Sequence, residues 1–164
     1  MTLTNTCLPA DPAIHDLRPF ASEQRLIELV LTEVPNAIEA SVKREGGNVV
    51  APDSKLLLAL LTYCYVVGVY GSEDIEWACH NDLGTRHLYD LEARHIRPKT
   101  FPDRGAIQRF RRAHAPLIEA CLTRVLAAMV PSCLPPTADH RRVVPAREKL
   151  QLAIKMDTAV FDFD

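Results

Sequence analysis

Five side chains in one short segment suit the binding of phosphate groups. The segment FPDRGAIQRFRRAH spans residues 101–114, and it carries Arg104, Gln108, Arg109, Arg111 and Arg112. A guanidinium group stays charged at physiological pH and donates two parallel hydrogen bonds to a phosphate or to the edge of a guanine. The segment is therefore a candidate nucleic-acid surface, and the competing interpretation is an ordinary solvated basic face.

The same segment has the pattern of a short helix. Asp103 stands where a helix N-cap belongs. At about 100° per residue, Ile107 and Phe110 fall on one side of this helix. The other side carries Arg104, Gln108, Arg111 and Arg112. We predict that the helix over 103–112 buries its apolar side and presents the arginines to water. Phosphate contacts are then expected from Lys99, Arg104, Arg109, Arg111 and Arg112.

Charge is divided unevenly along the chain. The formal net charge is −2, which by itself excludes no class of partner. Residues 1–93 carry 6 Lys and Arg against 14 Asp and Glu, whereas residues 94–164 carry 13 against 7. This asymmetry predicts that the second half meets either a polyanion or the acidic first half of the chain.

No other set of side chains forms a recognisable chemical site in the sequence. The five cysteines include no C-x-x-C pair, which argues against a zinc site. His80, His87 and His114 lack a second ligand at helical spacing apart from common acids, so we expect no complete metal site. Trp77 can act as a stacking surface for a base or as a packing residue, and its apolar neighbours favour packing.

The sequence predicts a protein of the cytoplasm. An odd number of cysteines in apolar settings is typical of buried thiols in a reducing compartment. The chain does not open with a basic and apolar leader. The longest apolar run, from Leu56 to Gly71, is shorter than the about 20 residues that a membrane-spanning helix needs. We therefore expect no membrane partner.

Hydrophobic periodicity predicts an all-α fold, a compact helical bundle. A helix that starts at Ser22 carries an apolar stripe and is expected to break or kink at Pro35. The helix over 52–67 is apolar all round and must be enclosed by the others. Ser72 is expected to cap the following helix, and the helix over 116–129 has a stripe with a period of 3.6 residues.

The end of the chain departs from this helical pattern. Leu150, Leu152, Ile154 and Met156 alternate with other residues, as in a β-strand. Because a single strand is not stable alone, we expect it to begin a domain that this chain does not complete. The predicted divisions are a loose arm over 1–21, a helical domain over 22–130, a linker rich in Pro and Arg over 131–148, and the strand region over 149–164.

Four pieces of the sequence resemble a known family when they are taken in order. They are LLLALLTYCYVVGVYGS, EDIEWACHNDLGTRHL, FPDRGAIQRFRRAH and PLIEACLTRVL. Together they resemble the InsH-like N-terminal helical domain of bacterial DDE-class insertion-sequence transposases. The residues that match the family's motif in the third piece are Pro102, Asp103, Ile107, Phe110 and Arg111. The resemblance covers residues 52–130 and implies a DNA-binding and assembly module placed ahead of an RNase H-like catalytic domain.

The resemblance also implies a place for Asp157. In this family the first catalytic carboxylate follows a strand, and three carboxylates together hold two divalent metal ions such as Mg²⁺. Asp157 and Thr158 stand at the corresponding place, whereas the second Asp and the Glu are missing. A plain carboxylate at the end of a strand is the alternative for Asp157. The chain is thus expected to be no enzyme on its own and to need no cofactor.

Two functions follow as expectations. In the first, the chain is the DNA-binding module of a truncated insertion-sequence transposase. Its helices over 72–83 and 103–112 then form a helix-turn-helix-like pair on double-stranded DNA. In the second, it is a helical dimerisation module whose interface is formed by the segment 22–44 and the apolar helix. Such a module would form a homodimer, or a mixed dimer that inhibits a full-length transposase.

Overall fold

The computed structural model describes residues 17–45, 52–92, 100–129 and 145–159, and this part of the chain is helical without any strand. The helices are α2 (Leu17–Glu45), α3 (Pro52–Val67), α4 (Ser72–Asn81), α5 (Leu83–Glu92), α6 (Arg104–Ala113), α7 (Ala115–Met129) and α8 (Ala146–Ala159). The prediction of a helical bundle is confirmed. None of the described helices is both long and apolar enough to cross a membrane by itself.

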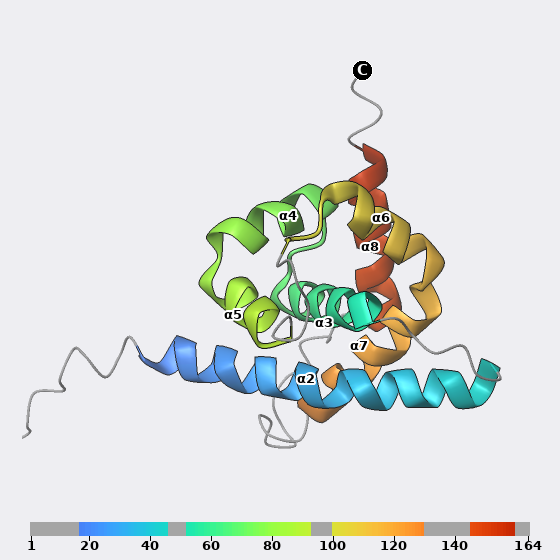
Figure 1. The fold of residues 1–164 in the computed structure, drawn as a ribbon, viewed down its shortest axis with the longest axis horizontal. Coiled ribbons are helices and arrows are strands. Elements are labelled where there is room, and N and C mark those ends of the chain that lie inside the picture. Colours follow the sequence, from blue (N-terminus) through green and yellow to red (C-terminus); the bar gives the residue numbers. More distant parts are fainter. Residues whose placement is uncertain (1–16, 46–51, 93–99, 130–144, 160–164) are drawn as a thin grey trace, which may run out of the picture.

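The helices surround α3, as Figure 1 shows. The long helix α2 lies along one side of the molecule and packs on α3 and α7. Helices α4 and α5 pack on each other at one end, while α6, α7 and α8 form the opposite side. Helix α4 also packs on α6, so these two helices lie side by side although α5 separates them in the sequence.

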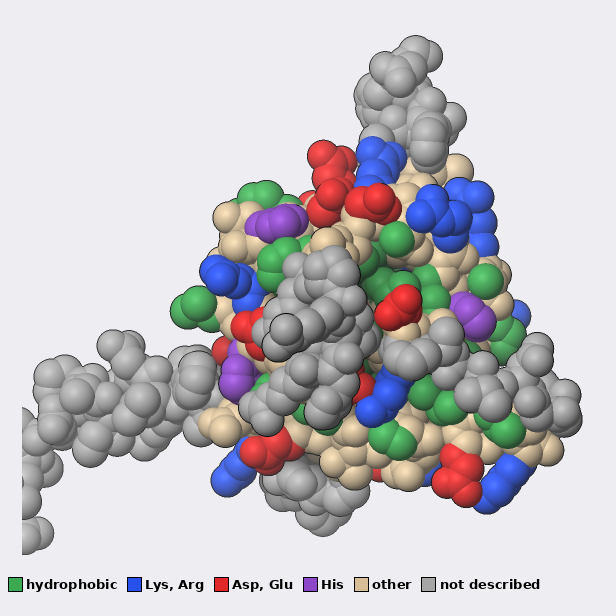
Figure 2. All heavy atoms as spheres, in the orientation of Figure 1, with side chains coloured by type: hydrophobic (Ala, Val, Ile, Leu, Met, Phe, Trp, Pro, Cys, Tyr) green, Lys and Arg blue, Asp and Glu red, His purple; other side chains and the backbone are tan. Residues whose placement is uncertain are grey.

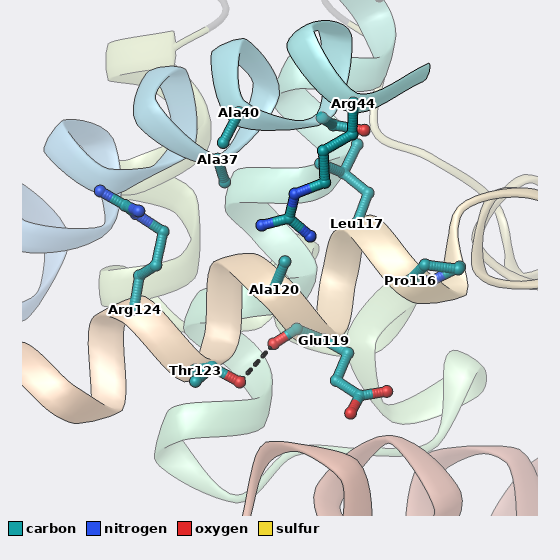
Figure 3. Close-up of a pocket in the computed structure, with 10 residues that line it drawn as sticks. Ala37, Ala40, Arg44, Pro116, Leu117, Glu119, Ala120, Thr123 and Arg124 are labelled. Carbon is teal, nitrogen blue, oxygen red and sulfur yellow. Dashed lines mark hydrogen bonds between the residues drawn. The ribbon is translucent and has the colours of Figure 1, made fainter.

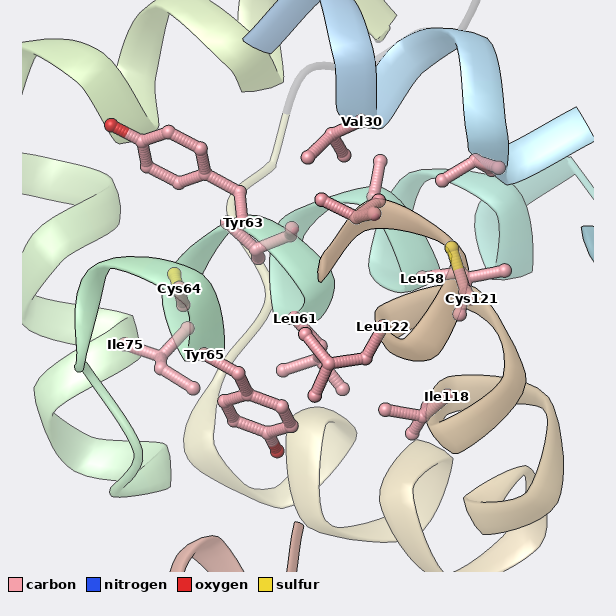
Figure 4. Close-up of a cluster of buried hydrophobic side chains, with 14 of the residues drawn as sticks. Val30, Leu58, Leu61, Tyr63, Cys64, Tyr65, Ile75, Ile118, Cys121 and Leu122 are labelled. Carbon is pink, nitrogen blue, oxygen red and sulfur yellow. The ribbon is translucent and has the colours of Figure 1, made fainter. Parts of the chain in front are cut away.

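The core is built on α3, because this helix has no polar side to present to water. Its residues from Leu58 to Tyr65 are all at most 1% exposed. Figure 4 shows α3 side chains meeting Val30 of α2 and Leu122 of α7. Tyr63 and Tyr65 leave α3 in nearly opposite directions. The prediction that this helix is enclosed by the others is confirmed.

Helix α2 differs from its prediction in two respects, its first residue and its continuity at Pro35. It begins at Leu17, inside the predicted arm, while residues 1–16 lie outside the described part of the chain. It also continues through Pro35 as one helix, so of the predicted break or kink the break is wrong. Pro35 faces solvent, whereas Val34 and Ala37 are 1% and 2% exposed. Burial on both sides of the proline outweighs the loss of one backbone hydrogen bond.

Helix α8 replaces the predicted β-strand. Residues 146–159 are helical, so the strand predicted from Leu150, Leu152, Ile154 and Met156 in the region 149–164 is wrong, and the helix begins inside the predicted linker. In the helix Leu150 is buried, but Leu152, Ile154 and Met156 are 42%, 47% and 38% exposed. The alternation of apolar residues is therefore real, but it does not decide the structure. Residues 130–144 and 160–164, with most of the predicted linker, lie outside the described residues.

Candidate functional site

Helix α6 forms as the sequence predicted, and its start is fixed by a side-chain cap. The carboxylate of Asp103 accepts a hydrogen bond from the backbone N–H of Ala106 at 2.6 Å. Ile107 and Phe110 are 0% and 6% exposed, so they hold the apolar side of the helix in the core. The cap and these two anchors give the polar side of α6 a fixed position.

Three arginines of α6 reach the surface to different degrees. Arg109 and Arg112 are exposed. Arg104 is partly exposed, and its Nη1 lies 3.9 Å from a carboxylate oxygen of Glu73 on α4. Figure 2 shows Lys and Arg side chains over α6, next to Asp and Glu side chains near the start of α4. The basic surface is therefore real, but it is bordered by acidic groups that attract Arg104.

Gln108 does not stand in the predicted surface as a free side chain. Gln108 is half-buried, and its Nε2 donates to Oγ of Ser72 at 3.1 Å. Lys99, which was predicted to contact phosphate, lies outside the described residues. The basic surface of α6 thus consists mainly of Arg109 and Arg112, with Arg104 at its edge.

Arg111 corrects the prediction most strongly, because it is 3% exposed and points into the molecule. Its Nε donates to the hydroxyl of Tyr65 at 2.6 Å, and its Nη2 donates to the carbonyl of Tyr70 at 3.0 Å. Its Nη1 donates to the carbonyl of Ala153 at 3.1 Å and also to the carboxylate of Asp157. All three nitrogens of the guanidinium group therefore donate hydrogen bonds and its charge is paired, as a buried charge must be.

Asp157 binds two groups that come together only in the folded chain. Its Oδ2 forms an ion pair with Arg111. Its Oδ1 accepts hydrogen bonds from the backbone N–H and the Oγ of Ser72, at 2.9 and 2.7 Å. Ser72 is the first residue of α4, whose N-cap, Gly71, has no side-chain cap. The predicted cap by Ser72 is wrong, and the carboxylate of Asp157 supplies the negative charge that the start of this helix favours.

The surroundings of Asp157 do not fit the divalent metal that the resemblance implies. Mg²⁺ needs several oxygen ligands, whereas Asp157 is surrounded by N–H and O–H donors and by a guanidinium group. The described residues contain no group of three or more His, Cys, Asp or Glu side chains that can hold a metal ion. In this arrangement Asp157 is a link between helices, and it lies on a helix instead of after a strand.

A second buried charge, which sequence reasoning missed, also attaches α8. Lys149 donates to the carbonyl of Tyr65 at 3.1 Å and to the hydroxyl of Tyr70 at 3.0 Å. Burial raises the pKa of Tyr65 to about 12, although Arg111 opposes this shift. The Tyr65 phenol therefore stays neutral at physiological pH, and the ion pair of Arg111 is formed with the carboxylate of Asp157. The signal was the spacing of Lys149, Ala153 and Asp157, which places them on one side of a helix.

Trp77 lies on the surface, contrary to the prediction that it packs in the core. Its side chain is 64% exposed, while Ile75 and Ala78 beside it are 0% and 4% exposed. The packing side of α4 is fully supplied by these two residues and Cys79. Leu83, at the start of α5, is also on the surface and is 76% exposed.

A groove lies between α2 and α7, away from the α6 surface, and is drawn in Figure 3. Small side chains form its floor, with Ala37 and Ala40 on α2 facing Ala120 on α7. Arg44 reaches over the groove from the end of α2, and Arg124 pairs with Glu33 at 2.8 Å. The hollow measures about 450 Å³.

Comparisons with known proteins give no relative for this chain. No protein-family model matches it, and no significant match occurs among curated proteins or solved structures.

Proposed function

We propose that this chain is a DNA-binding and assembly module of the kind found in insertion-sequence transposases, without catalytic activity of its own. The observation that supports it best is the exposure of Arg109 and Arg112 on a helix whose other side is anchored in the core. A fixed row of guanidinium groups can contact successive phosphates without first ordering its own backbone. The assignment to the class of insertion-sequence transposases rests on the resemblance of residues 52–130 to their helical domain.

The roles of the α6 side chains differ in this proposal. Arg109 and Arg112 make the main phosphate contacts, because they are exposed. Arg104 contributes less, since the neighbouring Glu73 carboxylate partly neutralises it. Helix α4 packs on α6 and supports it, as the first helix of a helix-turn-helix pair supports the second. Because α5 lies between them in the sequence, the pair differs from a strict helix-turn-helix.

Fluorescence anisotropy with a labelled DNA duplex at several salt concentrations tests the proposal. The protein should bind at low salt, and the double variant Arg109→Ala/Arg112→Ala should lower the slope of log K against log salt by about 1.8, which corresponds to two phosphate contacts. The double variant Arg25→Ala/Arg86→Ala on α2 and α5 is the matched control, since it removes two exposed arginines away from α6. Equal losses in both variants, or no binding at low salt, would exclude this surface.

The second candidate function is a helical dimerisation module, and one observation favours it. The groove between α2 and α7 offers small side chains and about 450 Å³ of space to another helix. The apolar helix α3 cannot form the interface that the sequence suggested, because the chain's own helices enclose it. Light scattering should give the mass of a dimer, and Ala40→Arg in the groove should convert it to a monomer. A monomeric wild-type protein excludes this candidate.

A further inference from the structure

The stripe of polar side chains on α6 consists of Arg104, Gln108 and Arg111, and its last member is buried. Arg104, Gln108 and Arg111 stand at spacings of four and three residues, so they lie along one side of the helix. Arg111 is the member of this stripe that α8 covers. A hollow of about 210 Å³ between α6 and α8 reaches this position; it is lined by Gln108, Arg111, Arg112, Ile154, Asp157 and Thr158. Arg111 thus lies directly beside the exposed Arg112, at the covered end of the basic surface.

Two separate sets of contacts hold the Arg111 guanidinium group. The first set comes from the bundle, where Nε and Nη2 donate to Tyr65 and Tyr70. The second set comes from α8, where Nη1 donates to the carbonyl of Ala153 and to the Asp157 carboxylate. If α8 moves away, the first set still orients the guanidinium group while Nη1 becomes available. The group would then be positioned to bind another oxyanion at the place of the carboxylate.

Both apolar burial and polar contacts attach α8 to the bundle. Its buried apolar side chains are Ala146, Leu150 and Ala153. Its larger apolar residues Leu152, Ile154 and Met156 remain partly exposed. Because alanine buries little area, the contacts of Lys149 and Asp157 carry much of the attachment.

From these contacts we infer that α8 is an autoinhibitory latch, in which the Asp157 carboxylate occupies the place of a DNA phosphate on Arg111. The inference rests on the proposed DNA-binding function and adds Arg111 to its phosphate contacts. In the docked state Arg104, Arg109 and Arg112 bind DNA without it. When α8 is released, Arg111 joins them and the affinity for duplex DNA rises.

The test compares Asp157→Asn with Glu148→Gln in the full chain. Both substitutions remove one negative charge from α8, but Glu148 is exposed, and none of the described Arg111 contacts involves it. Affinity for a DNA duplex at low salt is measured by anisotropy, and the opening of α8 is measured by amide hydrogen exchange. Asp157→Asn should speed exchange in α8 and tighten binding on the order of threefold to tenfold, the effect of one added phosphate contact. Glu148→Gln should do neither.

Two further variants keep the test decisive. Lys149→Met weakens the α8 attachment and removes a positive charge, so tighter binding by this variant would oppose the change in net charge and support the latch. The double variant Asp157→Asn/Arg111→Gln should lose the gain of Asp157→Asn. Equal tightening by Asp157→Asn and Glu148→Gln overturns the latch and leaves the proposed function standing. Absence of DNA binding in the wild type and in every variant overturns the proposed function and the latch together.

Discussion

Helices α3 and α8 have similar lengths, 16 and 14 residues, but the chain holds them in different ways. Helix α3 is apolar on all sides and is enclosed by its neighbours. Helix α8 buries one leucine and two alanines, and it is fixed by Lys149 and by the pair of Asp157 with Arg111. Apolar burial is non-directional and shared by the whole core, whereas the polar contacts each depend on one geometry. Loss of an α3 contact should therefore destabilise the whole bundle, and loss of an α8 contact should release one helix.

The largest effect is expected from Leu61→Ala in α3. This residue is 0% exposed, and its truncation should lower the free energy of unfolding by about 2–5 kcal/mol. The matched change on α8 is Leu152→Ala, at a residue 42% exposed, which should cost less than about 1 kcal/mol. Urea unfolding followed by circular dichroism measures both. Similar losses in the free energy of unfolding for the two variants would contradict the view that α3 and α8 are held in different ways.

A smaller loss in the free energy of unfolding is expected at alkaline pH, and it comes from buried thiols of the core. Burial raises the pKa of Cys121 from 9.0 to about 11 and that of Cys79 from 9.0 to about 12. Because the unfolded chain ionises these thiols first, stability is fully present below pH 9 and falls as the pH rises toward the folded-state values. From pH 9 to pH 10 the loss should be about 1 kcal/mol for each thiol. Urea unfolding at both pH values tests this, and Cys121→Ser should reduce the slope.

Lys149→Met should have a local effect of about 1–2 kcal/mol. The variant removes the hydrogen bonds from Nζ to Tyr65 and Tyr70, and it leaves the α3 core unchanged. Amide exchange should accelerate in α8 and stay slow in α3. Lys155→Met, at an exposed position of the same helix, serves as the control and should change neither rate. Faster exchange across the whole bundle after Lys149→Met would contradict a separately released helix.

The smallest effect is expected at the start of α6. Asp103→Ala removes the cap on the Ala106 N–H and should cost about 1 kcal/mol. Asp103→Asn keeps an oxygen acceptor at this place and should cost clearly less. Thermal unfolding of the two variants gives the comparison, and equal shifts would show that the negative charge, not the cap, stabilises this helix.

The sequence predicted the bundle well because α6 and α7 bury residues at the spacing of a helix and α3 is apolar on all sides. Asp103, Ile107 and Phe110 occupy the predicted places for the same reason. The prediction failed where an element depends on distant polar partners. Arg111 looked like one more surface arginine, and its pair, Asp157, stands 46 residues further along the chain. No local pattern could reveal this contact.

The strand predicted at the end of the chain failed for a related reason. The alternation of apolar residues is compatible with a β-strand. The same segment is also compatible with a helix, one side of which carries Ala146, Lys149, Ala153 and Asp157. The bundle stabilises the helix through that side, and three apolar residues are left partly exposed. Of the predicted surface residues, Arg109 and Arg112 lie as expected, because exposure of an arginine needs no partner.

The packing of α2 on α7 has a consequence for synthesis of the protein on the ribosome. Val30 and Leu122 belong to one core although more than half of the chain separates them, and both helices cover α3 (Figures 1 and 4). A nascent chain that stops before α7 therefore carries an apolar helix with one side uncovered. We expect such incomplete chains to be held by chaperones or to aggregate, and the bundle to close in one step after Met129 has left the exit tunnel.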